Sequence, residues 1–333
     1  MKIAILTPTF NHYSGIDRVV QNQAEEYSKN NEVTVFALES KIKSENYSVV
    51  KLGMPKNLFI QRLYRLFMFL DLRKLFFYKS LKNYDVVISH FYPLNIIAYL
   101  AKKKFGIKYI YFNHGVNTTG LLDSKIQRIY MILFSLFTNL SLKNVDEAYS
   151  VSNYLKNDLR IVSGLDSKVV YNQIDKQRFN TTITGDSIRK KYGLTGDTVL
   201  LYVGRIAPHK GVHLLLKIFN KVKSEIPNLK LVIVGKPTFK KYFINLKKKA
   251  SKDVIFTGFV DDLELPEFYG ACDLYVTASF WEGFDLPAAE AQACGKKVVA
   301  FDIGSHPEVI KNGSLIRKGD LSEFSKSIVG NLK

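Results

Sequence analysis

The chain has 333 residues, a length that suits two domains, each able to bury its own core. Its content of 47% hydrophobic and 23% charged residues excludes a disordered or fibrous protein. The formal net charge of +18 is compatible with nucleic acid, an anionic membrane surface or a phosphorylated substrate as partner, and composition does not choose among them.

Short β-branched runs alternate with longer amphipathic stretches along the whole chain. Most of the short runs are continuously apolar, as expected of strands buried on both faces of a parallel sheet. We expect strands at residues 2–7, 32–38, 85–90, 108–114, 147–151 and 168–171, and again at 198–204, 229–235, 254–258, 274–279 and 297–302. Helical patterns lie between them, which predicts an α/β fold of two doubly wound domains.

Apolar periodicity lapses in residues 172–184, and we expect the two domains to span 1–175 and 176–333. In open parallel sheets, ligands bind beyond the carboxyl ends of the strands. Polar residues gather at those ends: the loop after Thr7, His90, His114, Gly204-Arg205, Gly235-Lys236 and Ser279–Glu282. Two such domains facing each other would form the cleft of a two-substrate transferase, which is also the geometry of some epimerases and binding proteins.

Nothing in the sequence predicts export or a membrane span. The first residues, MKIAILTPTF, form an apolar run ended by Pro8, which favours a buried strand over a signal peptide. The longest apolar stretch, Ile129 to Leu140, is too short to cross a bilayer. Cys272 and Cys294 lack CxxC spacing, and we expect buried free thiols. A cytoplasmic location follows, with attachment to the inner face of the cell membrane left open.

The segment Gly204–Gly211 follows a predicted strand and precedes an apolar helix. Arg205 offers a planar fork of donors and Lys210 a point charge, and together they suit a diphosphate. Because neither a Walker nor a GxGxxG pattern is present, a surface loop with two solvated cations remains the alternative.

The segment Glu282–Gly295 begins in a loop after a strand and continues as a predicted helix, with Pro287 in its first turn. Backbone amides at this helix start can receive phosphate oxygens; they belong to Gly283, Phe284, Asp285 and Leu286. Glu290, one turn further, would reach the ribose of a nucleotide lying across the helix start. Alternatively, it is simply a favourable acid near a helix N-terminus.

Glu282 and Glu290 form an E-x7-E pattern, and the surrounding EGFDLPAAEAQACGKKVVAFDIGSHPEVI closely resembles the donor-site segment of GT-B-fold retaining glycosyltransferases of family 4. Other segments resemble the family in order along nearly the whole chain: SGIDRVVQNQAEEYSKNNEVTVF, SVSNYLKNDL, VVYNQIDKQRF, YVGRIAPHKGVHLLL and VIFTGFVDDLELPEFYGACDLYVTAS. The resemblance implies a GT-B fold, with two Rossmann-like domains facing across a cleft. The first would bind the acceptor and the second the nucleotide-sugar donor.

The resemblance also implies roles for single residues. Arg205 and Lys210 would bind the diphosphate, Glu290 the ribose, and Glu282 the donor sugar. The remaining assignments are His114 beside the transferred sugar, Gly15 with its backbone near the phosphate, and Val260 at the nucleobase. By itself, His114 is more simply explained as a strand-end histidine.

Four features depart from the family pattern. Ser14 replaces the first glycine of a pair, Gln173 a glycine of the linker, and Ala278 a proline. The chain also stops at Lys333, where members of the family usually continue with a helix that crosses back to the first domain. Closure of the domains is therefore expected to differ, unless the chain is a shortened one.

The mechanism implied by the resemblance is transfer of a hexose-type sugar with retention of configuration. The acceptor hydroxyl would attack on the face from which the nucleotide diphosphate departs, with basic residues and helix amides stabilising the leaving charge. No D-x-D pattern is present, so we expect no metal and no cofactor beyond the nucleotide-sugar substrate. Two alternatives stay open: a nucleotide-sugar 2-epimerase, and a catalytically silent subunit of a transferase complex.

Residues 56–82 contain seven basic residues and one acid, Asp71. A single helix here would carry Arg62, Arg65 and Arg73 on one face and Leu63, Leu70 and Phe77 on another. This composition is typical of an interfacial helix on anionic lipid, although a helix with a buried apolar face fits equally well. We favour a glycan or lipid-linked acceptor at a membrane surface, in cell-envelope polysaccharide or glycolipid synthesis. Nucleic acid is disfavoured because no binding module is evident.

Overall fold

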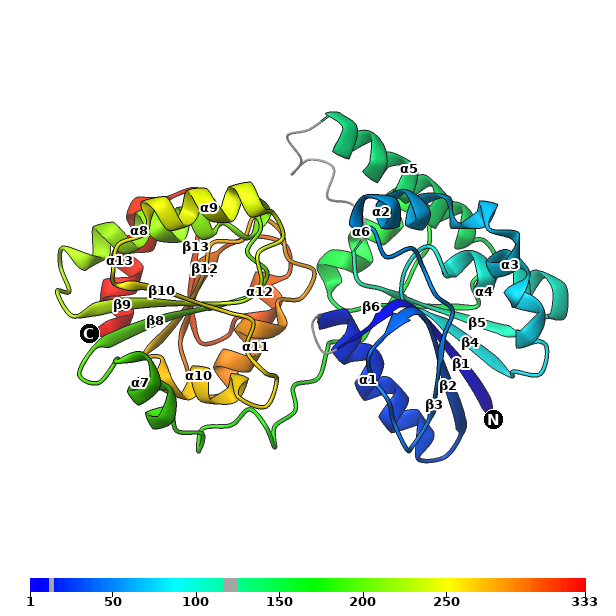
Figure 1. Cartoon of the computed structure of the whole chain (residues 1–333), viewed down its shortest axis with the longest axis horizontal. Coiled ribbons are helices and arrows are strands. Elements are labelled where there is room, and N and C mark those ends of the chain that lie inside the picture. The colour runs from blue at the N-terminus through cyan, green and yellow to red at the C-terminus, as the bar shows by residue number, and fades with distance from the viewer. Residues whose placement is uncertain (12–14, 116–124) are drawn as a thin grey trace. The chain divides into compact units, whose positions relative to one another are not determined.

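The computed structural model describes residues 1–11, 15–115 and 125–333 (Figure 1). The chain divides into two compact units, Met1–Asn172 and Gln173–Lys333. This boundary is three residues before the one that we expected, between residues 175 and 176. Each unit contains a parallel sheet with helices on both faces, so the doubly wound α/β class is confirmed.

The first unit contains a seven-stranded sheet in the order β3-β2-β1-β4-β5-β6-β7. Its strands are β1 (Lys2–Phe10), β2 (Glu32–Ser40), β3 (Ser48–Lys51), β4 (Val86–Ser89), β5 (Lys108–Asn113), β6 (Glu147–Ser150) and β7 (Lys168–Val169). Its longer helices are α1 (Gly15–Ser28), α4 (Asn95–Phe105), α5 (Lys125–Ser141) and α6 (Asn153–Ser163). Ile3 and Ile5 of β1 pack in one core with α1, whereas Ala4 and Leu6 pack in another with α4. Both faces of the strand are therefore buried.

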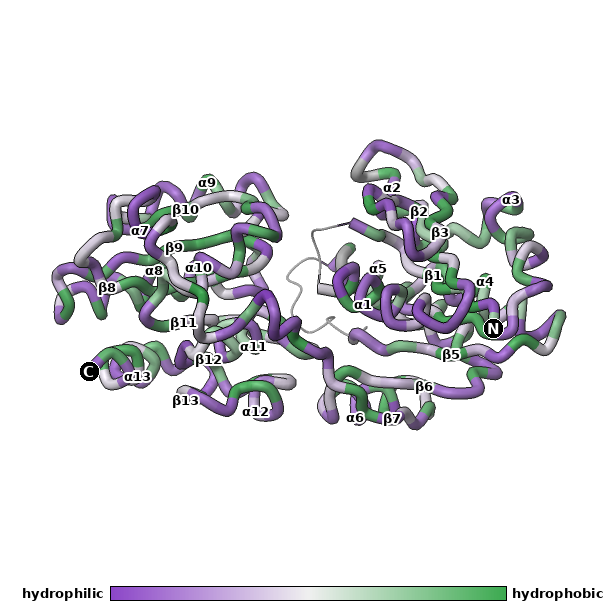
Figure 2. The backbone as a smooth tube through the Cα atoms, turned by 90° about the horizontal axis from the view of Figure 1, so that it is seen from below, coloured by the Kyte–Doolittle hydropathy of each residue, from purple (hydrophilic) through white to green (hydrophobic). Residues whose placement is uncertain are grey.

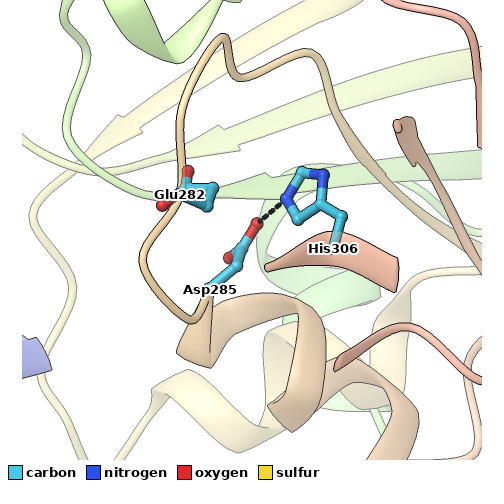
Figure 3. A group of neighbouring side chains, drawn as sticks. All are labelled: Glu282, Asp285 and His306. Atoms are coloured by element: carbon cyan, nitrogen blue, oxygen red, sulfur yellow. Dashed lines mark hydrogen bonds and ion pairs between the residues drawn. The ribbon is translucent and has the colours of Figure 1, made fainter. Parts of the chain in front are cut away.

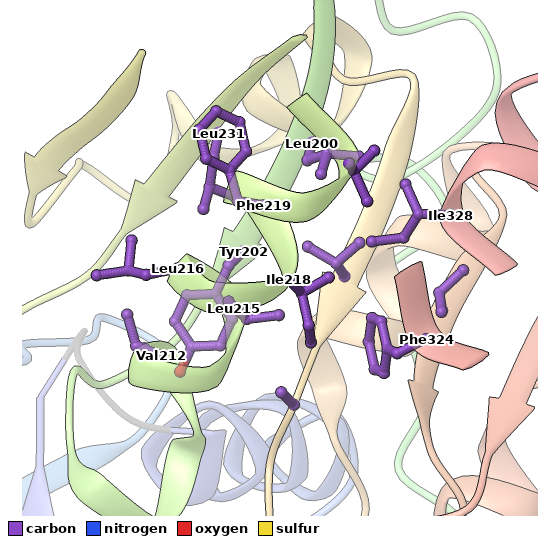
Figure 4. Close-up of a cluster of buried hydrophobic side chains, with 14 of the residues drawn as sticks. Leu200, Tyr202, Val212, Leu215, Leu216, Ile218, Phe219, Leu231, Phe324 and Ile328 are labelled. Carbon is purple, nitrogen blue, oxygen red and sulfur yellow. The ribbon is translucent and has the colours of Figure 1, made fainter. Parts of the chain in front are cut away.

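The second unit contains a six-stranded sheet in the order β10-β9-β8-β11-β12-β13. Its strands are β8 (Thr198–Val203), β9 (Leu229–Val234), β10 (Val254–Gly258), β11 (Leu274–Thr277), β12 (Val298–Phe301) and β13 (Gly313–Ile316). Its helices are α7 (Asp186–Tyr192), α8 (Val212–Lys223), α9 (Lys240–Lys249), α10 (Leu265–Ala271), α11 (Leu286–Ala293), α12 (His306–Val309) and α13 (Leu321–Leu332). Phe219 of α8 and Phe324 of α13 lie in one core with Leu200 of β8 (Figure 4).

The predicted strands are all present, although β1 continues beyond its predicted end to Phe10. The structure adds β3 and β13, which the sequence pattern did not predict. Both are edge strands of four residues, and most of their side chains are exposed or half-buried. A continuous apolar run marks a strand that is buried on both faces, and because these two strands are not, the signal is missing.

Residues 56–82 do not form the single helix that we predicted. They divide into α2 (Leu58–Phe67), the 3-10 turn η1 (Met68–Leu70), α3 (Leu72–Leu75) and the 3-10 helix η2 (Phe76–Leu81). The break is at Asp71, whose backbone leaves the helical region and whose carboxylate accepts from the Tyr64 hydroxyl and the Lys74 amide. The basic and apolar faces that we predicted for one helix therefore do not continue beyond α2. Phe77, for example, packs against Phe36 of β2.

Several large apolar side chains of this region are exposed. Their exposed fractions run from 36% to 69%, and they belong to Ile60, Leu63, Phe67, Leu70, Leu72 and Phe76. Other apolar side chains of the same segment are buried in the hydrophobic clusters of the first unit: Leu66, Met68 and Leu81. The segment therefore has both a buried and an exposed apolar side. Along the rest of the chain, apolar runs alternate with hydrophilic ones (Figure 2). Among the described residues, no helix is long and apolar enough to cross a bilayer. Cys272 and Cys294 are buried and free, as predicted.

Candidate functional site

The order of strands brings together the two segments singled out in the second unit. β8 pairs with both β9 and β11, so the order of strands reverses at β8. The helices that follow its two neighbours, α9 after β9 and α11 after β11, pack in different cores on opposite faces of the sheet. Residues 204–211 follow β8 and residues 278–286 follow β11. Because β8 and β11 are parallel neighbours, these segments leave the same edge of the sheet side by side. This is the position at which doubly wound sheets bind ligands.

Gly211 shows how closely the two segments approach. Its φ is +68°, and a Cβ atom there would lie 1.8 Å from the carbonyl oxygen of Ala278. The backbone amide of Phe280 also donates to the carbonyl of His209 at 2.8 Å. Any larger residue at position 211 would push the loops apart, and this gives a physical reason for the glycine after Lys210.

Lys210 and Glu282 form an ion pair across this junction. The Lys210 Nζ lies 2.6 Å from Glu282 Oε1, and the two side chains are 19% and 8% exposed. Arg205 is exposed on the same loop. Burial, together with the charges of Lys210 and Arg205, lowers the pKa of His209 to about 4. The loop thus carries two cations beside a neutral imidazole, which suits a diphosphate.

The helix start predicted at residues 283–286 is present, and α11 begins at Leu286. Gly283 and Leu286 are buried and Phe284 is half-buried. Asp285 caps the helix: its Oδ1 accepts from the backbone amide of Ala288 at 3.3 Å. The backbone amides of a capped helix start can hold an anion.

A second carboxylate–cation contact lies beside Glu282 (Figure 3). The Oδ2 of Asp285 is 2.9 Å from Nε2 of His306, and both residues are buried. Burial alone would lower the pKa of His306, but the hydrogen bond and charge of Asp285 and the charge of Glu282 raise it above its ordinary value. Burial opposes ionisation of Asp285 too, yet His306 and Lys210 hold its pKa low. Both shifts favour the ionised form of the pair. Sequence reasoning gave His306 no role, because nothing in GSHPEVI marks the histidine as a partner of Asp285.

Glu282, Asp285 and His306 also have the donor atoms of a metal site, since one ligand atom from each lies within 4.8 Å of the others. Each carboxylate already faces a protein cation: Lys210 for Glu282 and His306 for Asp285. The four charges balance, and a divalent ion would have to displace the ammonium of Lys210. The donor set therefore fits a metal poorly.

Glu290 lies inside the second unit, only 2% exposed, and its Oε2 accepts from the Tyr269 hydroxyl at 2.7 Å. Tyr269 of α10 packs edge-on against Phe179, which lies within residues 172–184, where we expected the linker. Sequence reasoning did not identify Tyr269, whose burial and contact only the fold reveals. A phenol hydroxyl that fixes one carboxylate oxygen orients the other.

Val260 is half-buried just beyond the end of β10, the edge strand of the sheet. The neighbouring Phe259 is 41% exposed, and the Lys236 Nζ lies 4.3 Å from the centre of its ring. Lys236 follows β9, so the strand next to β8 also ends in a basic residue. The predicted nucleobase border is thus on the same sheet edge as Arg205, separated from it by β9.

In the first unit, the pairing of β4 with β5 brings His90 and His114 together. The Nδ1 of His90 lies 3.0 Å from Nε2 of His114, and the rings are stacked with centroids 5.3 Å apart. Burial lowers the pKa of His114 to about 4, and burial and the neighbouring His114 lower that of His90 well below its usual range. Both rings are therefore neutral at pH 7, and one donates to the other. Gly15 is exposed at the start of α1, and the predicted departure at Ser14 lies outside the described residues.

Comparisons with known proteins identify the family of the chain. The sequence model of Glycosyltransferase Family 4 matches residues 13–178, and that of Glycosyl transferases group 1 matches residues 185–329. A lipopolysaccharide 1,2-N-acetylglucosaminetransferase of Salmonella typhimurium is 34% identical over 139 residues, which are 38% of this chain and 36% of that protein. A UDP-Gal:alpha-D-GlcNAc-diphosphoundecaprenol alpha-1,3-galactosyltransferase of Escherichia coli is 25% identical over 270 residues, or 76% and 68% of the two chains.

Among solved structures, HepE of Anabaena in complex with UDP-glucose superposes with a TM-score of 0.78 at 19% identity, covering 100% of this chain and 90% of that one. The chain spans 60%, 36% and 46% of three of the curated relatives it matches. The two family models together account for most of the sequence, one for each unit. The chain belongs to the GT-B-fold glycosyltransferases, in the family of glycosyl transferases group 1.

Proposed function

We propose that this protein is a retaining glycosyltransferase that moves a hexose-type sugar from a nucleotide diphosphate sugar to a hydroxyl group of a glycan or lipid-linked acceptor. The observation that carries the proposal is the Lys210–Glu282 pair, 2.6 Å apart where β8 and β11 end side by side. It combines a phosphate-binding cation with a carboxylate that can accept from a sugar hydroxyl. Residues 176–333 would bind the donor and residues 1–175 the acceptor.

The chemistry follows from the charges at this sheet edge. As the glycosidic bond breaks, negative charge develops on the diphosphate, and Arg205, Lys210 and the amides of the α11 start stabilise it. Glu282 and Glu290 hold the donor sugar and the ribose. The acceptor hydroxyl attacks on the face that the leaving group vacates and passes its proton to a phosphate oxygen. His114, which is neutral at pH 7, serves as a hydrogen-bonding partner of the sugar.

Two experiments test this function. Thermal unfolding of the purified chain with UDP, GDP and ADP and their sugars identifies the donor, because a bound ligand raises the midpoint. The chosen donor is then incubated with saccharide and lipid-linked acceptors, and the anomeric configuration of the product is determined. Epimerised nucleotide sugar in place of a transfer product would establish the 2-epimerase alternative. A chain that neither binds nor hydrolyses any donor would fit the silent subunit.

For the acceptor we propose a lipid-linked saccharide at an anionic membrane surface, in synthesis of a cell-envelope polysaccharide or glycolipid. α5 runs beside α2, since the Tyr130 hydroxyl donates to the carbonyl of Arg62 at 3.2 Å. One face of α5 carries exposed aliphatic side chains, with exposed fractions of 46% to 80%: Ile126, Ile129, Ile132, Leu136 and Leu140. Helices that combine such a face with basic residues bind anionic interfaces.

The Escherichia coli relative supports this choice, because its name gives a sugar on diphosphoundecaprenol as acceptor. Flotation with vesicles of phosphatidylglycerol and phosphatidylcholine, compared with phosphatidylcholine alone, tests it at low salt. We expect flotation only with the anionic vesicles and release as the salt concentration rises. Absence of flotation at low salt would refute the membrane-surface proposal and leave the transferase proposal intact.

A further inference from the structure

Asp285 has an unusual backbone conformation for an aspartate. Its φ is +64° and its ψ is 68°, in the left-handed region that glycine enters freely and other residues avoid unless a local hydrogen bond compensates. Among the described residues other than glycine, it shares a positive φ only with Asn144. The strained residue lies directly at the helix start that we assign to the donor, so what holds it there matters for binding.

His306 is the partner that holds it. The Nδ1 of His306 lies 2.6 Å from the carbonyl oxygen of Phe301, and Nε2 lies 2.9 Å from Oδ2 of Asp285. A carbonyl and a carboxylate can only accept, so both ring nitrogens carry protons and the ring is an imidazolium. Since His306 is completely buried, the ring has little freedom to turn away.

The segment that carries His306 is itself attached to the donor loop. The backbone amide and the hydroxyl of Ser305 donate to the carbonyl of Glu282 at 3.2 and 3.3 Å. Gly304, with φ +53°, packs so closely that a Cβ atom would lie 2.4 Å from the same oxygen. The loop from Glu282 to Asp285 is thus connected to the α12 segment at both of its ends: by these backbone contacts at Glu282 and by His306 at Asp285.

We propose that His306 is a positioning residue of the donor site: its charged ring fixes Asp285, and through it the amides of residues 283–286, in the arrangement that receives the donor. The inference rests on the proposed function. Without the imidazolium, the buried carboxylate of Asp285 would turn toward the next cation, Lys210, whose charge it already senses. Lys210 would then be drawn from Glu282 and from the diphosphate. The other groups that sense the charge of Asp285 are Tyr202 and Tyr275, whose hydroxyls stay protonated and cannot replace a cation.

A rescue experiment tests this role. The variant His306→Gln leaves the carboxylate without its cation, whereas Asp285→Gly combined with His306→Gln removes the carboxylate and places glycine in the conformation that suits it. The full chain is measured with the best-bound of UDP, GDP and ADP by calorimetry, and with the matching donor sugar by steady-state kinetics. We expect His306→Gln to raise the Kd of the nucleoside diphosphate at least 10-fold and to lower kcat/KM for the donor sugar by at least as much, because Lys210 no longer reaches the diphosphate. The double variant should recover most of that loss.

A matched control breaks an ion pair elsewhere in the same unit. Asp253 precedes β10 and pairs with Lys223 and Lys230, so it is remote in the sheet from the loops that follow β8 and β11. Asp253→Asn should lower the melting temperature without changing the donor KM. The inference is overturned if His306→Gln behaves like this control, or if the double variant binds no better than His306→Gln alone.

Two further outcomes keep the test decisive. If His306→Gln does not fold, the Kd of the double variant still decides. A Kd within about 3-fold of the wild-type value supports the pair, and a Kd that is 10-fold higher contradicts it. If the wild-type chain binds no nucleoside diphosphate, the proposed function fails rather than this inference. If the wild type binds and His306→Gln binds equally well, only the inference fails.

Discussion

Replacing Lys210 by methionine separates stability from catalysis. The change keeps the length of the side chain but leaves Glu282, whose side chain is 8% exposed, without the cation 2.6 Å away. Removing one partner of a buried pair costs roughly 3–5 kcal/mol, and because Lys210 is itself 19% exposed we expect the low end, about 3 kcal/mol. In a domain the size of the second unit this lowers the melting temperature by about 6–12 °C.

Glu282→Gln should be far milder for stability, since the partly exposed ammonium of Lys210 can turn to water. We expect a loss of about 1 kcal/mol at most. The double variant Lys210→Met, Glu282→Gln contains no buried charge without a partner, and its stability should lie close to that of Glu282→Gln. For transfer the order differs: both variants that lack Lys210 should lose roughly two to three decades in kcat/KM, because a donor to the leaving phosphate is gone.

Calorimetric unfolding and donor turnover, measured on the three variants and wild type, check these expectations. Circular dichroism at the assay temperature shows that each variant is folded before its rate is compared. An unchanged melting temperature for Lys210→Met would refute the premise that the pair is desolvated. Transfer by the double variant at wild-type rates would show that the pair serves the fold alone.

Arg205→Ala should lower transfer by roughly two to three decades with little change in melting temperature, since the side chain is exposed; a near wild-type rate would contradict its role at the diphosphate. EDTA should leave the activity unchanged, and loss that Mg²⁺ or Mn²⁺ restores would argue against basic residues as the stabilisers of the leaving group. His114 has a folded pKa of about 4, mainly through burial, below its unfolded value of about 6.5, so the stability it contributes is complete above pH 6.5 and is lost as pH falls toward 4. His114→Gln should therefore reduce the fall in unfolding free energy over that range by up to roughly 3 kcal/mol, and an unchanged slope would contradict a neutral imidazole. The double change Ile129→Ser and Ile132→Ser should weaken flotation with anionic vesicles at least 10-fold without altering the melting temperature, and unchanged flotation would exclude the α5 face as the docking surface.

Much of the fold could be predicted because buried parallel strands leave a strong signal. The runs that became β4 and β9 are almost wholly apolar, and each was predicted with its ends within a residue or two. The sequence failed where burial is partial. β3 and β13 pair on one side only, and the helix expected over residues 56–82 breaks at Asp71, whose carboxylate offers a local alternative to the helical hydrogen bonds.

The donor site divides in the same way. The sequence by itself determined which residue types stand at the ends of the strands, including Arg205, Lys210, Glu282 and Glu290, because strand ends and helix starts are local features. Which of them meet was decided only by the tertiary structure. The pairing of β8 with β11 brings Lys210 to Glu282, and burial supplies Glu290 with Tyr269. His306 reaches Asp285 from another segment, and no local pattern encodes a contact that depends on the order of strands in a sheet.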